Sequence, residues 1–188
     1  MTVRAPSFGT IVDALDTEGV RYAVIGAAAR NVWAPPRLST DFDFAVLIDE
    51  TAYEALVDRL AGLGYSLTQT SNVDPNQLVP DVASFRNDEL APPLRQIDIL
   101  FAHTRFEREA VEAAVDRRVG GQPVRVVTRE HLITYKLIAW RARDREDVAD
   151  VVATAEAAEI PIEWDLIRRW AREWNVLDRL EKVRPTSV

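Results

Sequence analysis

The 188-residue sequence contains no cysteine, only two histidines and only two lysines. Without cysteine the chain has no disulfide framework, no thiolate zinc site and no thiol nucleophile. No apolar run approaches the roughly 20 residues that a membrane helix needs, and the first ten residues carry no apolar signal segment. We therefore expect a protein of the reducing cytoplasm with no membrane partner.

The chain is acidic, but its charge is unevenly distributed. Its formal net charge is -7, and residues 1–102 account for all of it, with 7 arginines against 14 acidic residues. Residues 125–145 instead hold six basic residues against two acidic ones. A net negative charge argues against a nucleic-acid partner, because phosphate binding normally appears as a basic patch. The basic segment nevertheless keeps a polyanionic partner open.

Apolar periodicity and turn residues predict an α/β fold with a mixed sheet. Hydrophobic residues, at 47% of the chain, are sufficient for a core. We expect a core of residues 1–128 and a helical C-terminal extension of residues 129–188 packed on it. Predicted strands cover 21–26, 40–47, 78–86 and 95–102, with a further hairpin at Gly120-Gly121. Predicted helices cover 8–15, 27–33, 51–63, 106–115, 128–141, a segment capped by Asp144, and 164–180.

Carboxylates and aromatic residues alternate along residues 40–47. On a strand this pattern places Asp41 and Asp43 on one face, roughly 6 to 7 Å apart, and Phe42 and Phe44 on the other. Two like charges so placed repel one another unless a cation lies between them, and Mg²⁺ prefers such oxygen ligands. Solvated carboxylates at the start of a strand are the alternative interpretation.

A second alternating strand, over residues 95–101, carries one acid, Asp98, on the face opposite its apolar residues. If this strand lies beside the first, Asp98 completes a carboxylate triad able to hold two metal ions for phosphoryl transfer. The alternative is that Asp98 forms a surface ion pair with Arg95 or Arg86.

Gly26 lies where a predicted strand turns into a predicted helix. Free backbone N–H groups and the helix dipole favour phosphate at such a point, and a glycine lets the backbone approach closely. A glycine is also the ordinary residue of a tight turn, so this signal alone is not specific.

The order of these motifs resembles the nucleotidyltransferase superfamily of polymerase beta type. The spacing Arg37-x-Ser39-x-Asp41-x-Asp43 and the later segment from Lys136 to Val148 look similar to AbiEii-type toxin nucleotidyltransferases and related antibiotic nucleotidyltransferases. The likeness spans about residues 20–152.

The resemblance implies an Mg²⁺-dependent enzyme that transfers a nucleoside monophosphate from a nucleoside triphosphate to an acceptor hydroxyl. It implies that Asp41 and Asp43 bind two Mg²⁺ and that Asp98 holds the catalytic metal and helps to deprotonate the acceptor. The residues that it implies for triphosphate binding are Gly26, Ala27, Arg37, Ser39, Lys136 and Arg143.

The acceptor stays open between tRNA, a protein side chain and a small molecule, and an antitoxin is a further partner that the resemblance suggests. The family turn usually reads Gly-Gly or Gly-Ser, whereas here it is Gly26-Ala27. This departure supports an alternative function, a catalytically inactive binding module such as a toxin–antitoxin-like component or a nucleotide sensor.

Overall fold

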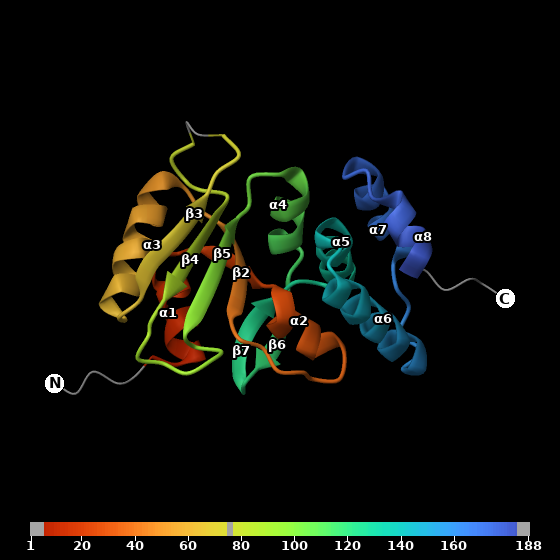
Figure 1. Cartoon of the computed structure of the whole chain (residues 1–188), viewed down its shortest axis with the longest axis horizontal. Helices are drawn as coiled ribbons and strands as arrows, with labels where there is room; N and C mark the ends of the chain where they lie inside the picture. The colour runs from red at the N-terminus through yellow and green to blue at the C-terminus, as the bar shows by residue number, and fades with distance from the viewer. Residues whose placement is uncertain (1–5, 75–76, 184–188) are drawn as a thin grey trace.

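The computed structural model of the chain describes residues 6–74 and 77–183 (Figure 1). Its elements in chain order are α1 (Phe8–Thr17), β1 (Arg21–Val24), α2 (Gly26–Trp33), β2 (Phe42–Leu47), α3 (Glu50–Gly62), β3 (Ser66–Ser71), β4 (Val82–Arg86), β5 (Gln96–Phe101), α4 (Arg105–Glu112), β6 (Val115–Val119), β7 (Gln122–Val126), α5 (Arg129–Ala139), α6 (Ala142–Ala157), α7 (Trp164–Glu173) and α8 (Leu177–Val183). No helix among the described residues is long and apolar enough to cross a membrane.

The strands form one mixed sheet in the order β3-β4-β5-β2-β1-β7-β6. β2 runs parallel to β5 and antiparallel to β1, and it is the central strand of the sheet. One neighbour, β5, carries Asp98, and the other, β1, leads into Gly26. The predicted α/β class and mixed sheet are confirmed. The helices α5 to α8 stand together beside one end of the sheet (Figure 1), while the boundary predicted at residue 128 stays a prediction.

Alternation along β2 separates its two faces. Phe44 is fully buried and, with Phe42, contacts the ring of Phe8 on α1 at centroid distances of 6.0 and 4.4 Å. Burial of aromatic rings of this size is a large hydrophobic contribution, so the apolar face fixes which way the strand lies. Asp43 consequently faces away from α1, whereas Asp41, predicted to lie on the strand, directly precedes it because β2 begins at Phe42 rather than residue 40.

The helical half differs from the prediction in three places. The helix after Thr128 ends at Ala139 rather than Arg141, because Trp140 adopts a left-handed conformation with φ 52°. Asp144 is not the N-cap of the next helix: Arg141 holds that position, and Asp144 accepts its backbone N–H from the third helical position. The predicted helix 164–180 is two helices, α7 and α8, separated near Asn175, whose φ is also positive.

The sheet differs from the prediction at its edges. The edge strand β3 was not predicted, and all six of its residues are exposed. β4 begins at Val82 rather than residue 78, and α4 ends at Glu112, so that Val115 already belongs to β6. The hairpin at Gly120-Gly121 is confirmed as the turn between β6 and β7.

Candidate active site

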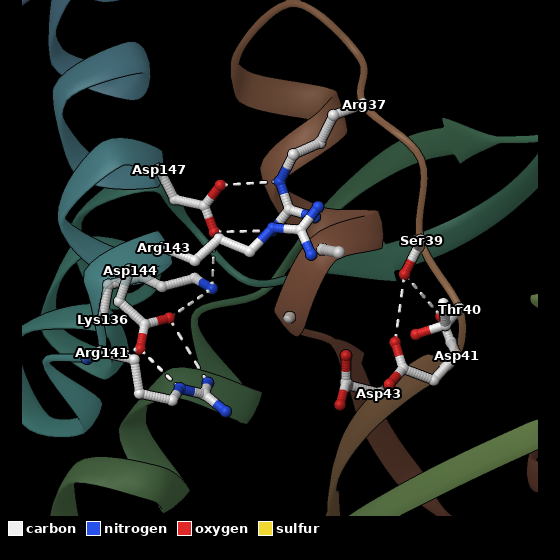
Figure 2. Close-up of a pocket in the computed structure, with 12 residues that line it drawn as sticks. Arg37, Ser39, Thr40, Asp41, Asp43, Lys136, Arg141, Arg143, Asp144 and Asp147 are labelled. Carbon is white, nitrogen blue, oxygen red and sulfur yellow. Dashed lines mark hydrogen bonds and ion pairs between the residues drawn. The ribbon is translucent and has the colours of Figure 1, made fainter.

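A cavity of about 250 Å³ lies where the sheet meets α2, α5 and α6 (Figure 2). Every predicted site residue except Asp98 lines it. The lining residues are Gly26, Ala27, Arg37, Ser39, Thr40, Asp41, Asp43, Lys136, Arg141, Arg143, Asp144 and Asp147. Residues more than 100 positions apart in the sequence thus meet in one cavity.

Asp43 and Asp98 come from the adjacent strands β2 and β5, and Asp41 directly precedes β2. Asp43 on β2 is the register partner of Asp98 on β5, so the two side chains leave the same face of the sheet side by side. Asp98 is not paired with Arg95 or Arg86; instead the amide Nε2 of Gln96 donates to its two carboxylate oxygens at 3.2 and 3.0 Å. Ser39 Oγ donates to the backbone oxygen of Asp41 at 2.9 Å and to its carboxylate at 3.1 Å.

Gly26 makes an unusually close approach to Asp43. Its φ is +61°, and a Cβ atom built on it would lie 1.8 Å from Oδ2 of Asp43. The strands β1 and β2 are also joined here, because the N–H of Ile25 donates to the backbone oxygen of Asp43 at 3.0 Å. Glycine suits this position for two reasons: it adopts positive φ without steric cost, and it leaves space for the carboxylate of Asp43.

Gly26→Ala tests this contact, with Gly120→Ala as a matched control. Gly120 has a similar φ of +57°, but a Cβ there meets nothing within 4 Å. We expect Gly120→Ala to cost about 1 to 2 kcal/mol from backbone strain alone, and Gly26→Ala to cost about 1 to 3 kcal/mol more from overpacking. Urea denaturation measures both. Equal losses in the two variants would contradict a close contact between Gly26 and Asp43.

The carboxyl group of Asp43 has a raised pKa. Burial, followed by the negative charges of Asp41 and Asp98, raises its pKa from 3.8 to about 6. Lys136 and a hydrogen bond from the Ala27 N–H oppose this rise only in part. Ile25, the N-cap residue of α2, makes no side-chain hydrogen bond to the helix. Backbone N–H donors of the helix N-terminus and carboxylate acceptors therefore lie side by side.

A group of ion pairs faces the carboxylates across the cavity (Figure 2). Asp147 accepts two hydrogen bonds from Arg37, from Nε and Nη2, both at 2.8 Å. Lys136 Nζ lies 2.9 Å from both Asp144 and Asp147, and Arg30, itself buried, lies 3.4 Å from Asp147. Arg37 therefore does not neutralise Asp41 and Asp43 directly. The ion pairs hold the predicted phosphate-binding cations Arg37 and Lys136 at fixed positions.

The two acids of this group are ionised despite their burial. Asp144 and Asp147 are each about 2% exposed in their side chains. Burial alone would raise both pKa values, but hydrogen bonds from Arg141 and Lys136 hold the pKa of Asp144 below its ordinary value, and those from Arg37 and Lys136 do the same for Asp147. The buried cations of this group, Lys136 and Arg30, thus each have an anionic partner.

Sequence reasoning did not assign Asp144, Asp147, Arg141 and Thr40 to the site. The left-handed Trp140 ends α5, and α6 begins at Ala142, so that Lys136 on α5 meets Asp147 on α6. A signal for these acids was present in the sequence. Asp144 and Asp147 are three positions apart and follow soon after Lys136, the single lysine in the interior of the sequence.

The donor set fits a divalent cation in its chemistry. Three carboxylates, two on neighbouring strands and one directly before β2, lie close enough for Asp41 and Asp98 to raise the pKa of Asp43, and a hard cation relieves that repulsion. Within the described residues no group of three or more acidic or histidine side chains is already arranged to hold a metal ion. Hydrogen bonds from Ser39 and Gln96 position the carboxylates of Asp41 and Asp98.

No protein-family model and no curated protein matches the sequence, whereas several solved structures are similar in fold. An antigenic nucleotidyltransferase-like protein from Paracoccidioides brasiliensis shares 15% identity at a TM-score of 0.55, covering 95% of this chain and 93% of that one. ANT(2")-Ia in complex with adenylyl-2"-tobramycin shares 14% identity at a TM-score of 0.57, covering 88% and 95%. The lincosamide antibiotic adenylyltransferase LnuA, with lincomycin bound, shares 13% at 0.52, covering 80% and 99%.

Proposed function

We propose that this chain, which has the nucleotidyltransferase fold of these structures, is an Mg²⁺-dependent enzyme that transfers a nucleoside monophosphate from a nucleoside triphosphate to an acceptor hydroxyl. The observation that carries the proposal is the register of Asp43 with Asp98 on adjacent parallel strands, with Asp41 directly before β2 and the N-terminus of α2 against Asp43. A carboxylate cluster that can bind metal ions thus lies beside a helix N-terminus whose backbone N–H groups can bind phosphate.

The charge balance of the cavity supports the need for a metal. Its lining holds four cationic and four anionic side chains, namely Arg37, Lys136, Arg141 and Arg143 against Asp41, Asp43, Asp144 and Asp147. A nucleoside triphosphate carries about four negative charges, so the side chains alone leave it without net compensation. Divalent cations that enter with the triphosphate supply the missing positive charge.

The residues have distinct roles in the proposed reaction. The backbone at Gly26 and Ala27, together with Lys136, Arg37 and Arg143, binds and orients the triphosphate, and Ser39 positions Asp41. Asp41, Asp43 and Asp98 would hold Mg²⁺, which when bound would offset the negative charge of the phosphate oxygens and leave the phosphorus more open to attack. The acceptor oxygen forms a bond to the α-phosphorus while the bond from that phosphorus to the bridging oxygen breaks and pyrophosphate leaves. Asp98 receives the acceptor proton.

Transfer of label from an α-labelled nucleoside triphosphate tests the function. In the presence of Mg²⁺ we expect label on a hydroxyl acceptor in a panel of total RNA, proteins and small molecules. Asp98→Asn is expected to lower the rate by about 100-fold or more, because it removes a metal ligand and the base together. Asp88→Asn is the control, since Asp88 is 76% exposed and pairs only with Arg86. Transfer that survives Asp98→Asn would contradict the assignment.

A non-catalytic nucleotide-binding module is the second candidate. The observation that favours it is Ala27, which offers the triphosphate no hydroxyl and whose N–H already donates to Asp43. Calorimetric titration with Mg²⁺ and a triphosphate separates the two functions. Tight binding without transfer to any acceptor supports the module, and absence of binding contradicts both.

A further inference from the structure

A second cavity, of about 400 Å³, lies on the other side of the segment 37–39. The outer face of α2, the β6–β7 turn and Pro93 enclose it, and Arg37 and Ser39 line it as well as the first cavity. Its size is in the range that holds most of a drug-sized molecule. The segment 37–39 therefore separates the two cavities and contributes residues to both.

The lining of this second cavity is mainly apolar. Val32, Leu38, Phe42, Pro93 and Val119 contribute side chains to it, and no acidic residue does. Leu38 is 90% exposed, which places a large apolar side chain in water between two residues of the proposed active site. Together with Val32, Phe42, Pro93 and Val119 it forms a contiguous apolar lining, and an apolar patch of this kind is typical of a ligand-binding surface.

The charges at this cavity are of one sign. Arg118 lines it and donates to the backbone oxygen of Gly121 at 2.7 Å. Within the part of the chain that the structure describes, no ion pair joins Arg118 to a carboxylate. The other cation, Arg37, is already paired with Asp147. A ligand with an apolar body and a neutral or anionic polar group is complementary to this surface, whereas a polycation is not.

We propose that the second cavity binds the acceptor, and that the acceptor is a small hydroxylated molecule with an apolar body and no positive charge. This inference rests on the proposed function. A ligand seated against Leu38 and Val119 has its other end at Ser39, whose hydroxyl contacts Asp41. Because Arg37 and Ser39 line both cavities, a ligand in the second cavity lies next to the proposed triphosphate site. The many phosphates of a polymer such as RNA are poorly matched to this mainly apolar lining.

Binding is tested with 1-anilinonaphthalene-8-sulfonate, an apolar anion whose fluorescence rises in apolar surroundings. Leu38→Glu places a negative charge beside the cavity, and Leu78→Glu makes the same change at another exposed leucine, 69% exposed and outside the cavity lining. We expect Leu38→Glu to weaken binding of the dye at least 10-fold and Leu78→Glu to change it less than 2-fold. Both variants should bind a nonhydrolysable triphosphate with Mg²⁺ as the unaltered chain does.

Acceptor choice is tested with labelled triphosphate and two sets of probes, uncharged alicyclic or aromatic alcohols and the polycation kanamycin. Label on the apolar alcohols, lost in Leu38→Glu and retained in Leu78→Glu, supports the proposal. Preferential labelling of kanamycin or RNA, or dye binding that is equal in the two variants, overturns it. Dye binding that depends on Leu38, with no transfer to any acceptor, would refute the proposed function while the cavity stands as a ligand site.

Discussion

Asp43→Asn is expected to stabilise the metal-free protein at pH 8 and, at the same time, to reduce nucleotidyl transfer by about 100-fold or more. Burial and two neighbouring carboxylates raise the pKa of Asp43 from 3.8 to about 6. A shift of that size corresponds to about 3 kcal/mol of cost for the ionised form. Asparagine removes the charge but keeps an oxygen that can accept the N–H of Ala27, so we expect a gain of about 1 to 3 kcal/mol.

The dependence of this gain on pH follows from the direction of the shift. Between pH 3.8 and about 6 the folded protein holds a proton on Asp43 that the unfolded chain has lost, so the contribution of Asp43 to stability falls as the pH rises. Below pH 3.8 both states are protonated and the two proteins should have similar free energies of unfolding. Above pH 6 the difference should reach its full value.

Urea denaturation from pH 4 to pH 8 without divalent metal measures the effect, and Asp58→Asn, an exposed acid on α3, is the control. We expect the control to change stability by less than about 0.5 kcal/mol. A loss of stability in Asp43→Asn at pH 8, or a gain of the same size at pH 4, would contradict the electrostatic interpretation. Loss of transfer together with gain of stability separates a functional acid from a structural one.

Asp147→Asn is expected to lower the free energy of unfolding by about 3 to 5 kcal/mol, as removal of one member of a buried ion pair typically does. Asp147 has a side chain that is 2% exposed, and it accepts from Arg37 and Lys136 at 2.8 and 2.9 Å. The substitution leaves these cations, together with the buried Arg30, around a neutral group. The pKa of Asp147 is lowered in the folded state, so its contribution is present at neutral pH and is lost as the pH falls.

Asp150→Asn provides the matched control, because Asp150 also pairs with Arg30 but is 54% exposed. Solvent screens an exposed pair, and we expect a loss of less than about 1 kcal/mol. Chemical denaturation at pH 7.5 compares the two variants. A similar loss in both would show that Asp147 is an ordinary member of the α6 surface rather than the centre of the ion-pair group.

The sequence predicted the sheet side of the site better than the helical side. Alternation along β2 and β5 depends only on the period of a strand and the burial of one face, so the common face of Asp43 and Asp98 could be inferred from spacing. The position of Gly26 could likewise be inferred, because a strand-to-helix turn of this kind requires positive φ.

The ion-pair group could not be predicted in this way. Its contacts depend on the left-handed Trp140, which ends α5 two residues before the predicted end and allows α6 to place Asp144 and Asp147 beside Lys136. A tryptophan with positive φ is not a residue that local propensity selects; tertiary packing decides it. β3 was missed for a related reason, since a strand exposed at every residue has no apolar alternation by which to recognise it.

The contact between Gly26 and Asp43 has a consequence for how this protein can change over generations. Because a Cβ at position 26 would lie 1.8 Å from the carboxylate of residue 43, position 26 cannot accept a larger residue while the side chain at position 43 stays as it is. A descendant that loses the glycine must also shorten or redirect residue 43, and with it lose the acid that we assign to the metal. Homologous sequences that have lost the activity should therefore show changes at positions 26 and 43 together, because the side chain at position 43 occupies the space of the absent Cβ at position 26.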